Sequence, residues 1–246
     1  MASPLQQFEI QTIIPIELSG YDISFTNSSL AMLGSIIIIT FVLFLGLRKT
    51  TLIPGKLQSF IELSYEFIAN MISDNIGKEG IKYFPFIFTL FFFILLGNLV
   101  GMLPFSFTWT SHIIVTFAIS FFIFLAVTFI AIFKHGIINF LAFFAPSGVP
   151  KVMLLLLVPI EIISYLSRPV SLSVRLFANM MAGHTLLKVI GGFVFVLAIN
   201  TFLVGALIPV TFLIALTGLE IVIAFLQAYV FAILTCLYIN DAIHLH

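Results

Sequence analysis

This sequence has little charge and almost no cysteine, and each shortage excludes a class of protein. Only 8% of its 246 residues are Asp, Glu, Lys or Arg, and ten cationic side chains balance ten acidic ones. Because soluble domains contain about 25% charged residues, we exclude a soluble globular domain. A net charge of zero gives no electrostatic basis for binding nucleic acid. The single cysteine, Cys236, excludes an intrachain disulfide and offers no metal-binding cluster.

The motifs that mark covalent catalysis are also missing. The sequence contains no glycine-rich phosphate loop, no HExxH zinc motif, no nucleophile elbow and no CxxC pair. We therefore expect no catalytic residue, no cofactor and no metal site in this chain. Residues 1–29 contain no Lys or Arg, so they do not resemble a basic signal or import sequence.

Hydrophobic residues make up 61% of the chain and gather in unbroken runs. A helix needs about 20 apolar residues to cross a bilayer, whereas a β-barrel shows short alternating segments. The runs therefore predict an all-α integral membrane protein with a single membrane domain, 1–246. Its expected parts are an outside-facing N-terminal segment (1–29), three ordinary spans (30–47, 83–103 and 113–133), an amphipathic surface helix (56–76), and a C-terminal hairpin of two long tilted helices (151–190 and 209–240).

Two of these segments differ from simple spans. Apolar side chains recur at helical spacing in 56–76, which predicts a helix lying on the membrane surface or against a partner. The segment 151–190 would measure about 60 Å as a helix, twice the ~30 Å of a bilayer core. It is either two broken helices or one strongly tilted helix, and the Gly191-Gly192 pair predicts a break after it.

Basic residues set the expected orientation. Most of them fall on one side of the membrane if the three spans alternate: Arg48, Lys49, Lys56, Lys78, Lys82, Lys134 and Lys151. The positive-inside rule makes this the inner side and places residues 1–29 and the loop 104–112 outside. In that loop we expect Trp109 to be an interfacial anchor and His112 to be solvated. The stretch from Lys134 to Gly136 is expected to end the third span.

A polar stripe crosses the apolar stretch 161–184, EIISYLSRPVSLSVRLFANMMAGH. On a helix six polar side chains fall within about 80° of one another: Glu161, Ser164, Arg168, Ser171, Arg175 and Asn179. A charge at membrane depth costs at least ~2.5–3.5 kcal/mol, so such residues usually face a cavity or a partner and serve transport. Two simpler alternatives remain: Arg168 can extend to the inner surface, and the serines can bond backbone carbonyls.

Arg175 is the strongest signal in this stripe. Its guanidinium stays protonated, so at membrane depth it needs an anionic or dipolar partner. Glu161 lies 14 residues away, about 21 Å along a helix, which is too far for an ion pair. Two partners remain possible: Glu220 of this chain, or a carboxylate of another subunit that Arg175 meets transiently.

Further polar residues lie within the last apolar segments. Glu220 and Gln227 are two helical turns apart on one face, and His184 lies on the preceding long segment. Glutamate and imidazole side chains at buried positions can exchange protons near neutral pH. With Asn98 and Asn179 as neutral polar lining, they fit a water-accessible proton path. The alternative for His184 is a hydrogen-bonded histidine of the core.

Four stretches together match one known family over nearly the whole chain. They are LSRPVSLSVRLFANMMAGH (166–184), LTGLEIVIAFLQAYVFAILTCLYINDAIHLH (216–246), GNLVGMLPFSF (97–107) and SFTNSSL (24–30). They resemble subunit a of the rotary F-type ATP synthase, in its mitochondrial or alphaproteobacterial form. The resemblance assigns family positions to Arg175, Asn179, His184, Glu220, Gln227 and Glu161.

The resemblance implies a proton-conducting stator subunit, with ATP chemistry on other subunits. Two offset half-channels would serve the carboxylates of a rotating c-ring. The outer one would involve His184, Glu220, Asn179 and Asn98, and the inner one would open near Glu161 and Ser164. Arg175 would prevent a direct proton leak between them.

The resemblance also implies partners and a location. We expect the chain to contact the c-ring, the peripheral-stalk subunits, other membrane-sector subunits and the lipid bilayer. The expected location is the mitochondrial inner membrane, with the inner membrane of an alphaproteobacterium as the alternative. Two other functions compete: a self-contained proton-coupled transporter or channel, and a structural membrane subunit without a conduction path.

Overall fold

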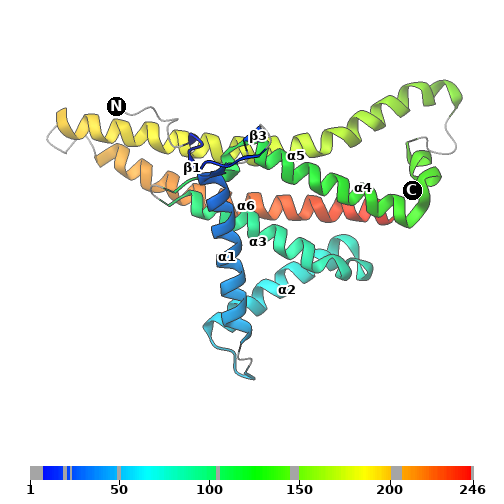
Figure 1. The fold of residues 1–246 in the computed structure, drawn as a ribbon, viewed down its shortest axis with the longest axis horizontal. Coiled ribbons are helices and arrows are strands. Elements are labelled where there is room, and N and C mark those ends of the chain that lie inside the picture. Colours follow the sequence, from blue (N-terminus) through cyan, green and yellow to red (C-terminus); the bar gives the residue numbers. More distant parts are fainter. Residues whose placement is uncertain are drawn as a thin grey trace. The chain divides into compact units, whose positions relative to one another are not determined.

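Helices dominate the part of the chain that the computed structural model describes, which is residues 8–18, 21–22, 24–48, 51–103, 106–144, 150–200 and 207–244. The helices are α1 (Asn27–Leu47), α2 (Lys56–Ile76), α3 (Phe84–Gly101), α4 (Ile113–Phe143), α5 (Lys151–Asn200) and α6 (Leu207–Ile243), with short 3-10 helices η2 (Lys78–Tyr83) and η3 (Trp109–Ser111) (Figure 1). Among the described residues, five segments are long and apolar enough to cross a membrane: Asn27–Leu47, Lys78–Gly101, Ile113–Leu141, Met153–Ile199 and Leu207–Ile243. The predicted all-α integral membrane fold is therefore confirmed.

The chain forms two compact units, and several long helices contribute to both. The first unit contains residues 1–61, 91–112 and 176–229, and the second contains 62–90, 113–175 and 230–246. The second half of α3, the second half of α5 and the first part of α6 thus belong to the first unit.

The N-terminal segment adds two small antiparallel strand pairs to the first unit. β1 (Thr12–Ile14) pairs with β4 (Phe25–Thr26), and β2 (Glu17–Leu18) pairs with β3 (Tyr21–Asp22). The Thr26 hydroxyl then caps α1 by accepting the backbone N–H of Ser29 at 3.4 Å. A threonine at this position satisfies one of the free N–H groups that every helix start exposes.

The amphipathic helix α2 begins and ends where its apolar spacing predicts. Ile68 and Ile72 are fully buried, whereas Leu57, Phe60 and Tyr65 are exposed. In the second unit, Gly80 of η2 packs against this buried side, because a Cβ there would lie 2.8 Å from a methyl of Ile72. The apolar residues of α2 therefore divide between a face packed inside the unit and a face left exposed.

Helix α4 extends beyond the predicted end of the third span. The chain kinks at Gly136, where φ is +80°, and the helix then continues to Phe143. Such a backbone conformation suits glycine because it has no Cβ. Lys134 forms an ion pair with Glu79 at 2.8 Å, and His135 Nε2 lies 3.0 Å from the carbonyl oxygen of Ile243. The first helical segment of α4 thus ends where the sequence predicts, and a second segment continues to Phe143 after the kink.

Helix α5 is one continuous helix, and the break predicted at Gly191-Gly192 is wrong. It runs for 50 residues through Pro159, Pro169 and both glycines (Figure 1). At 1.5 Å per residue this is about 75 Å, far more than a ~30 Å bilayer core. A glycine costs only about 1 kcal/mol relative to alanine in a helix. In lipid an unpaired backbone group costs several kcal/mol, so the helix is favoured over a break.

Candidate functional site

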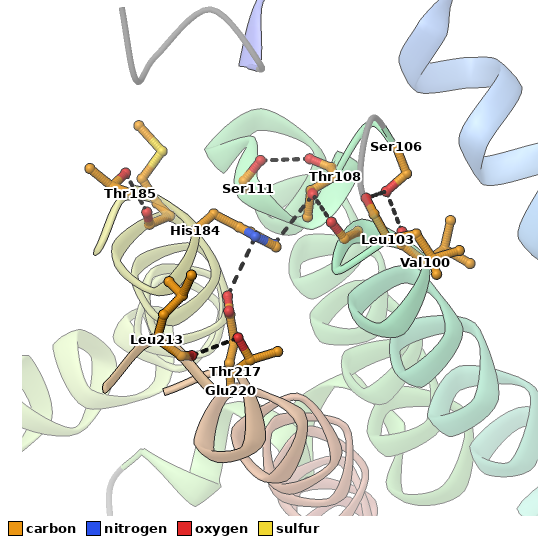
Figure 2. A network of polar contacts seen from close by, with 12 residues as sticks. Val100, Leu103, Ser106, Thr108, Ser111, His184, Thr185, Leu213, Thr217 and Glu220 are labelled. Carbon is orange, nitrogen blue, oxygen red and sulfur yellow. Dashed lines mark hydrogen bonds and ion pairs between the residues drawn. The ribbon is translucent and has the colours of Figure 1, made fainter. Parts of the chain in front are cut away.

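The first unit brings His184 of α5 and Glu220 of α6 together. His184 Nδ1 lies 3.4 Å from Glu220 Oε1, and the two residues are 7% and 3% exposed. Figure 2 shows the imidazole pointing from α5 toward the carboxyl group. Gly183 makes this approach possible, because a Cβ there would lie 2.6 Å from Glu220 Oε1. The sequence predicted both residues, and the structure adds that they form a pair.

On its other side His184 meets a residue that the sequence analysis missed. Thr108 Oγ1 lies 3.4 Å from His184 Nε2, and the same hydroxyl lies 3.2 Å from the carbonyl oxygen of Gly101 (Figure 2). Ser111 Oγ donates to the Thr108 carbonyl at 2.6 Å, which closes the short turn that carries Thr108. The only sequence signal was the density of hydroxyl groups in SFTWTS (106–111).

The turn is held in place by Trp109, which is not an interfacial anchor as predicted. Its side chain is fully buried and stacks on Phe93 at 4.6 Å between ring centroids. Gly97 leaves room for the indole, since a Cβ there would lie 2.2 Å from a ring carbon. The prediction that His112 is solvated is also wrong: its ring is half-buried and stacks on Phe107 at 5.0 Å. Burial lowers the pKa of the His112 imidazole.

Asn98 joins α3 to α6 within the first unit. Its Nδ2 donates to the carbonyl oxygen of Ala224 at 3.2 Å, one helical turn after Glu220. The residue is fully buried, and its Oδ1 has no hydrogen-bond partner among the described residues. Gln227 and Asn179 are half-buried, and within the described chain their side chains make no hydrogen bond. The three amide groups therefore leave polar atoms without hydrogen bonds, and the Oδ1 of Asn98 is fully buried.

Arg175 is the last residue of the polar stripe that belongs to the second unit. Arg175 is exposed and, within the part of its unit that the structure describes, has no ion pair and no hydrogen bond. Glu161 is half-buried and Ser164 is exposed, and neither side chain has a hydrogen-bond partner among the described residues. These three predicted site residues thus present polar groups that the described chain does not satisfy.

Arg168, two turns before Arg175, is satisfied inside the second unit. Its Nη1 lies 3.0 Å from Asp241 Oδ2, and its guanidinium lies over the rings of Tyr165 and Tyr238, at 5.2 Å and 5.0 Å. Tyr165 OH is in turn 2.7 Å from Thr128 Oγ1. Arg168 therefore has an ion-pair partner within this unit, and its predicted extension to the inner surface stays a prediction. The sequence analysis did not identify Asp241 as its partner.

These arrangements define a class of protein. Among the described residues no group of three or more His, Cys, Asp or Glu side chains could hold a metal ion. The described residues contain a buried carboxyl–imidazole pair between two membrane helices, and this pair can pass a proton. They also contain an arginine that faces outward from a membrane helix. Intramembrane groups of this kind mark ion and proton pathways. The fold and the pair are those of a multi-pass membrane protein that moves protons.

Comparison with known proteins identifies the family. The family model of the ATP synthase A chain matches residues 29–240. The chain is 58% identical to the ATP synthase subunit a of Pelagibacter ubique, over 99% of this chain and 98% of that protein. It is 55% identical to that of Rhodospirillum rubrum, over all of both chains, and 54% identical to that of Paramagnetospirillum magneticum, again over all of both. The chain belongs to the ATP synthase A chain family, the proton-translocating stator subunits of the F-type ATP synthase.

Proposed function

We propose that this chain carries protons to and from the carboxylates of a c-ring through two offset half-channels, and that it performs no ATP chemistry itself. The observation that carries the proposal is that Arg175 is exposed and has no ion pair within the described part of its unit. A guanidinium stays charged, and at membrane depth it costs at least ~2.5–3.5 kcal/mol without a partner. Arg168 has Asp241, whereas the described residues of the same unit give Arg175 no anion. A carboxylate supplied by a neighbouring ring of subunits would meet this need at each rotational step.

The outer half-channel is assigned to residues of the first unit. His184 and Glu220 form its proton-exchanging pair, and Asn98, Asn179 and Gln227 supply neutral polar groups. The buried Oδ1 of Asn98 has no hydrogen-bond partner among the described residues, and the buried carboxyl oxygens of Glu220 have none besides the 3.4 Å approach of His184 Nδ1. Buried polar atoms are usually hydrogen-bonded, to protein or to ordered water, so this polarity supports a path that admits water.

The inner half-channel is assigned to Glu161 and Ser164 of the second unit. Both lie on α5 on the N-terminal side of Arg175, whereas Asn179 and His184 lie on its C-terminal side. Arg175 therefore divides the polar residues of this helix into two sets. Its fixed positive charge favours an ionised carboxylate passing it and repels a proton moving directly from one set to the other. A membrane potential supplies ~2.3 kcal/mol per charge per 100 mV to drive the cycle.

We infer that the membrane is a bacterial inner membrane. The relatives named above are all from alphaproteobacteria, and each aligns along nearly its full length. The mitochondrial location expected from the motifs has no support from them. The partners are taken to be the c-ring, the peripheral stalk and the remaining membrane-sector subunits.

The test is Arg175→Ala in the assembled ATP synthase. Proton-driven ATP synthesis in membrane vesicles should fall to background while the complex still assembles, because the c-ring carboxylate loses its cationic partner. Val174→Ala is the matched control, since Val174 is the exposed neighbour on the same helix. Near-normal synthesis by the Arg175→Ala complex would overturn the assignment. Selective proton conduction by the purified chain without a c-ring would instead support a self-contained channel.

A further inference from the structure

The hydroxyl of Thr108 lies between an acceptor and an imidazole nitrogen. Its oxygen is 3.2 Å from the Gly101 carbonyl oxygen and 3.4 Å from His184 Nε2, and Thr108 is 5% exposed. A hydroxyl has one hydrogen to donate and two lone pairs to accept with. A carbonyl oxygen can only accept. The direction of the two contacts is therefore decided by where the single hydrogen goes.

The Gly101 carbonyl is the group that needs this hydrogen. Gly101 is the last residue of α3, so its carbonyl lies in the final turn, where the helix supplies no N–H donor. Among the described residues the Thr108 hydroxyl is the donor within reach. If the hydroxyl pointed its hydrogen at His184 instead, two oxygens would face each other at 3.2 Å with no proton between them. The hydrogen therefore points to Gly101, and a lone pair points to His184.

We propose that Thr108 is a positioning residue that holds His184 in the tautomer protonated at Nε2. A lone pair at 3.4 Å accepts the Nε2–H of His184. In a neutral imidazole one nitrogen carries the proton and the other carries a lone pair. Nδ1 therefore presents its lone pair to Glu220, 3.4 Å away. This proposal rests on the proposed function, in which the pair exchanges protons.

The consequence is a defined proton transfer. When Glu220 is protonated, its O–H bond breaks and an Nδ1–H bond forms, which leaves a carboxylate beside an imidazolium. The imidazolium keeps its Nε2–H on Thr108, so the ring does not need to turn. The reverse step returns the same proton to the carboxylate. In the other tautomer Nδ1 already carries a proton, so the nitrogen that faces Glu220 cannot take one from it.

The surroundings of Thr108 keep its hydroxyl at this position. A Cβ at Gly101 would lie 2.5 Å from Thr108 Oγ1 and from its methyl, so the glycine allows the turn to pack directly on α3. Ser111 bonds the Thr108 carbonyl at 2.6 Å, and the next residue, Trp109, is fully buried. A rotamer fixed by packing on two sides is what a group needs if it is to orient a neighbouring ring.

The competing explanation is that Thr108 only closes the turn onto Gly101. The test uses the assembled ATP synthase in inverted membrane vesicles and measures ATP-driven proton pumping per assembled complex. Thr108→Val keeps the shape and removes the hydroxyl, and Thr108→Ser keeps the hydroxyl. We expect Thr108→Val to lose activity by about tenfold, the lower end of what partners that orient metal-bound histidines contribute, and Thr108→Ser to keep at least about half of it.

A double mutant separates positioning from turn closure. If Thr108 acts through His184, adding Thr108→Val to His184→Asn should lower pumping by less than about twofold further, because independent effects add whereas coupled ones do not. A full additional tenfold loss would show a structural role and overturn the proposal. Equal losses in Thr108→Val and Thr108→Ser, or normal pumping by Thr108→Val, would overturn it as well.

Failed assembly and the result for His184→Asn alone also test whether Thr108 positions His184. If Thr108→Val does not assemble, Thr108→Cys, which keeps a small side chain with a weak donor, is measured in the same way. Failure of both to assemble would show that Thr108 is structural and would overturn the proposal. Normal pumping by His184→Asn alone would contradict the proposed proton path itself. A defect in His184→Asn without one in Thr108→Val would contradict only the role of Thr108.

Discussion

Gly183 is the position where the smallest change should disturb the proton-exchanging pair most. It faces Glu220 across the contact between α5 and α6. A methyl group at Gly183 would lie 2.6 Å from Glu220 Oε1 and 3.1 Å from its Cδ. Ordinary contact begins near 3.4 Å, so in Gly183→Ala the carboxyl group must retreat by about 0.8 Å. The atoms that move belong to the end of a flexible side chain, so the backbones of the helices can stay in place.

The expected result is a loss of function without a loss of stability. Alanine favours a helix by about 1 kcal/mol over glycine, which offsets part of the steric cost. The carboxyl group, however, no longer lies at contact distance from His184. A misplacement of about 1 Å can lower the rate of a reaction between positioned groups on the order of 100-fold. We therefore expect Gly183→Ala to lower proton-driven ATP synthesis by about 10- to 100-fold.

The assay compares two alanine variants of the same helix. ATP synthesis driven by an imposed pH gradient and potential is measured in vesicles, per complex counted by immunoblot of the membrane. Gly192→Ala is the control, because a Cβ at Gly192 would have nothing within 4 Å. It should assemble and work normally. Normal synthesis by Gly183→Ala would refute the reasoning, and so would an equal loss in the Gly192→Ala control.

Two further predictions concern stability. Gly97→Ala should prevent assembly, because its methyl would lie 2.2 Å from the ring of the fully buried Trp109, which cannot retreat. Overpacking of this kind costs ~1–3 kcal/mol or more. Immunoblots for the chain in membranes would check this, and normal levels would contradict it. Asp241→Asn should weaken the contact with Arg168 by no more than about 1 kcal/mol, because the two side chains are 46% and 21% exposed. A thermal inactivation midpoint only slightly below that of the wild type is expected, and complete loss of the complex would show that the pair does more.

Hydropathy predicted the long apolar helices well because lipid leaves few alternatives to a helix. A long apolar run must satisfy its backbone internally, so its length and composition largely determine its structure. The same reasoning explains the error at Gly191-Gly192. Two glycines are a break signal in water, but in α5 they stay helical because a break would leave backbone groups unpaired. Sequence rules derived from soluble proteins gave too much weight to glycine here.

The contacts around the proton-exchanging pair were predictable only in part. His184 and Glu220 are conspicuous because each is polar within an apolar run. Thr108 is not, since hydroxyl residues are common in membrane segments and usually bond their own helix backbone. Its contact with His184 spans 76 residues of sequence and depends on Trp109 packing on Gly97. Such a contact depends on tertiary packing, which periodicity does not describe.

The two arginines of α5 differ in how the described chain satisfies their charge. Arg168 and Arg175 are two turns apart, about 10.5 Å along the same helix, and carry the same charge. Arg168 is held by an acid and two aromatic rings, an arrangement that fixes one geometry. Arg175 is exposed and the described residues of its unit leave it without an anion. A permanent intrachain partner would hold Arg175 as Asp241 holds Arg168 and would compete with every passing carboxylate. In the proposed function, an arginine that releases each carboxylate in turn has to lack such a partner, and the neighbouring subunits would supply the negative charge that it needs.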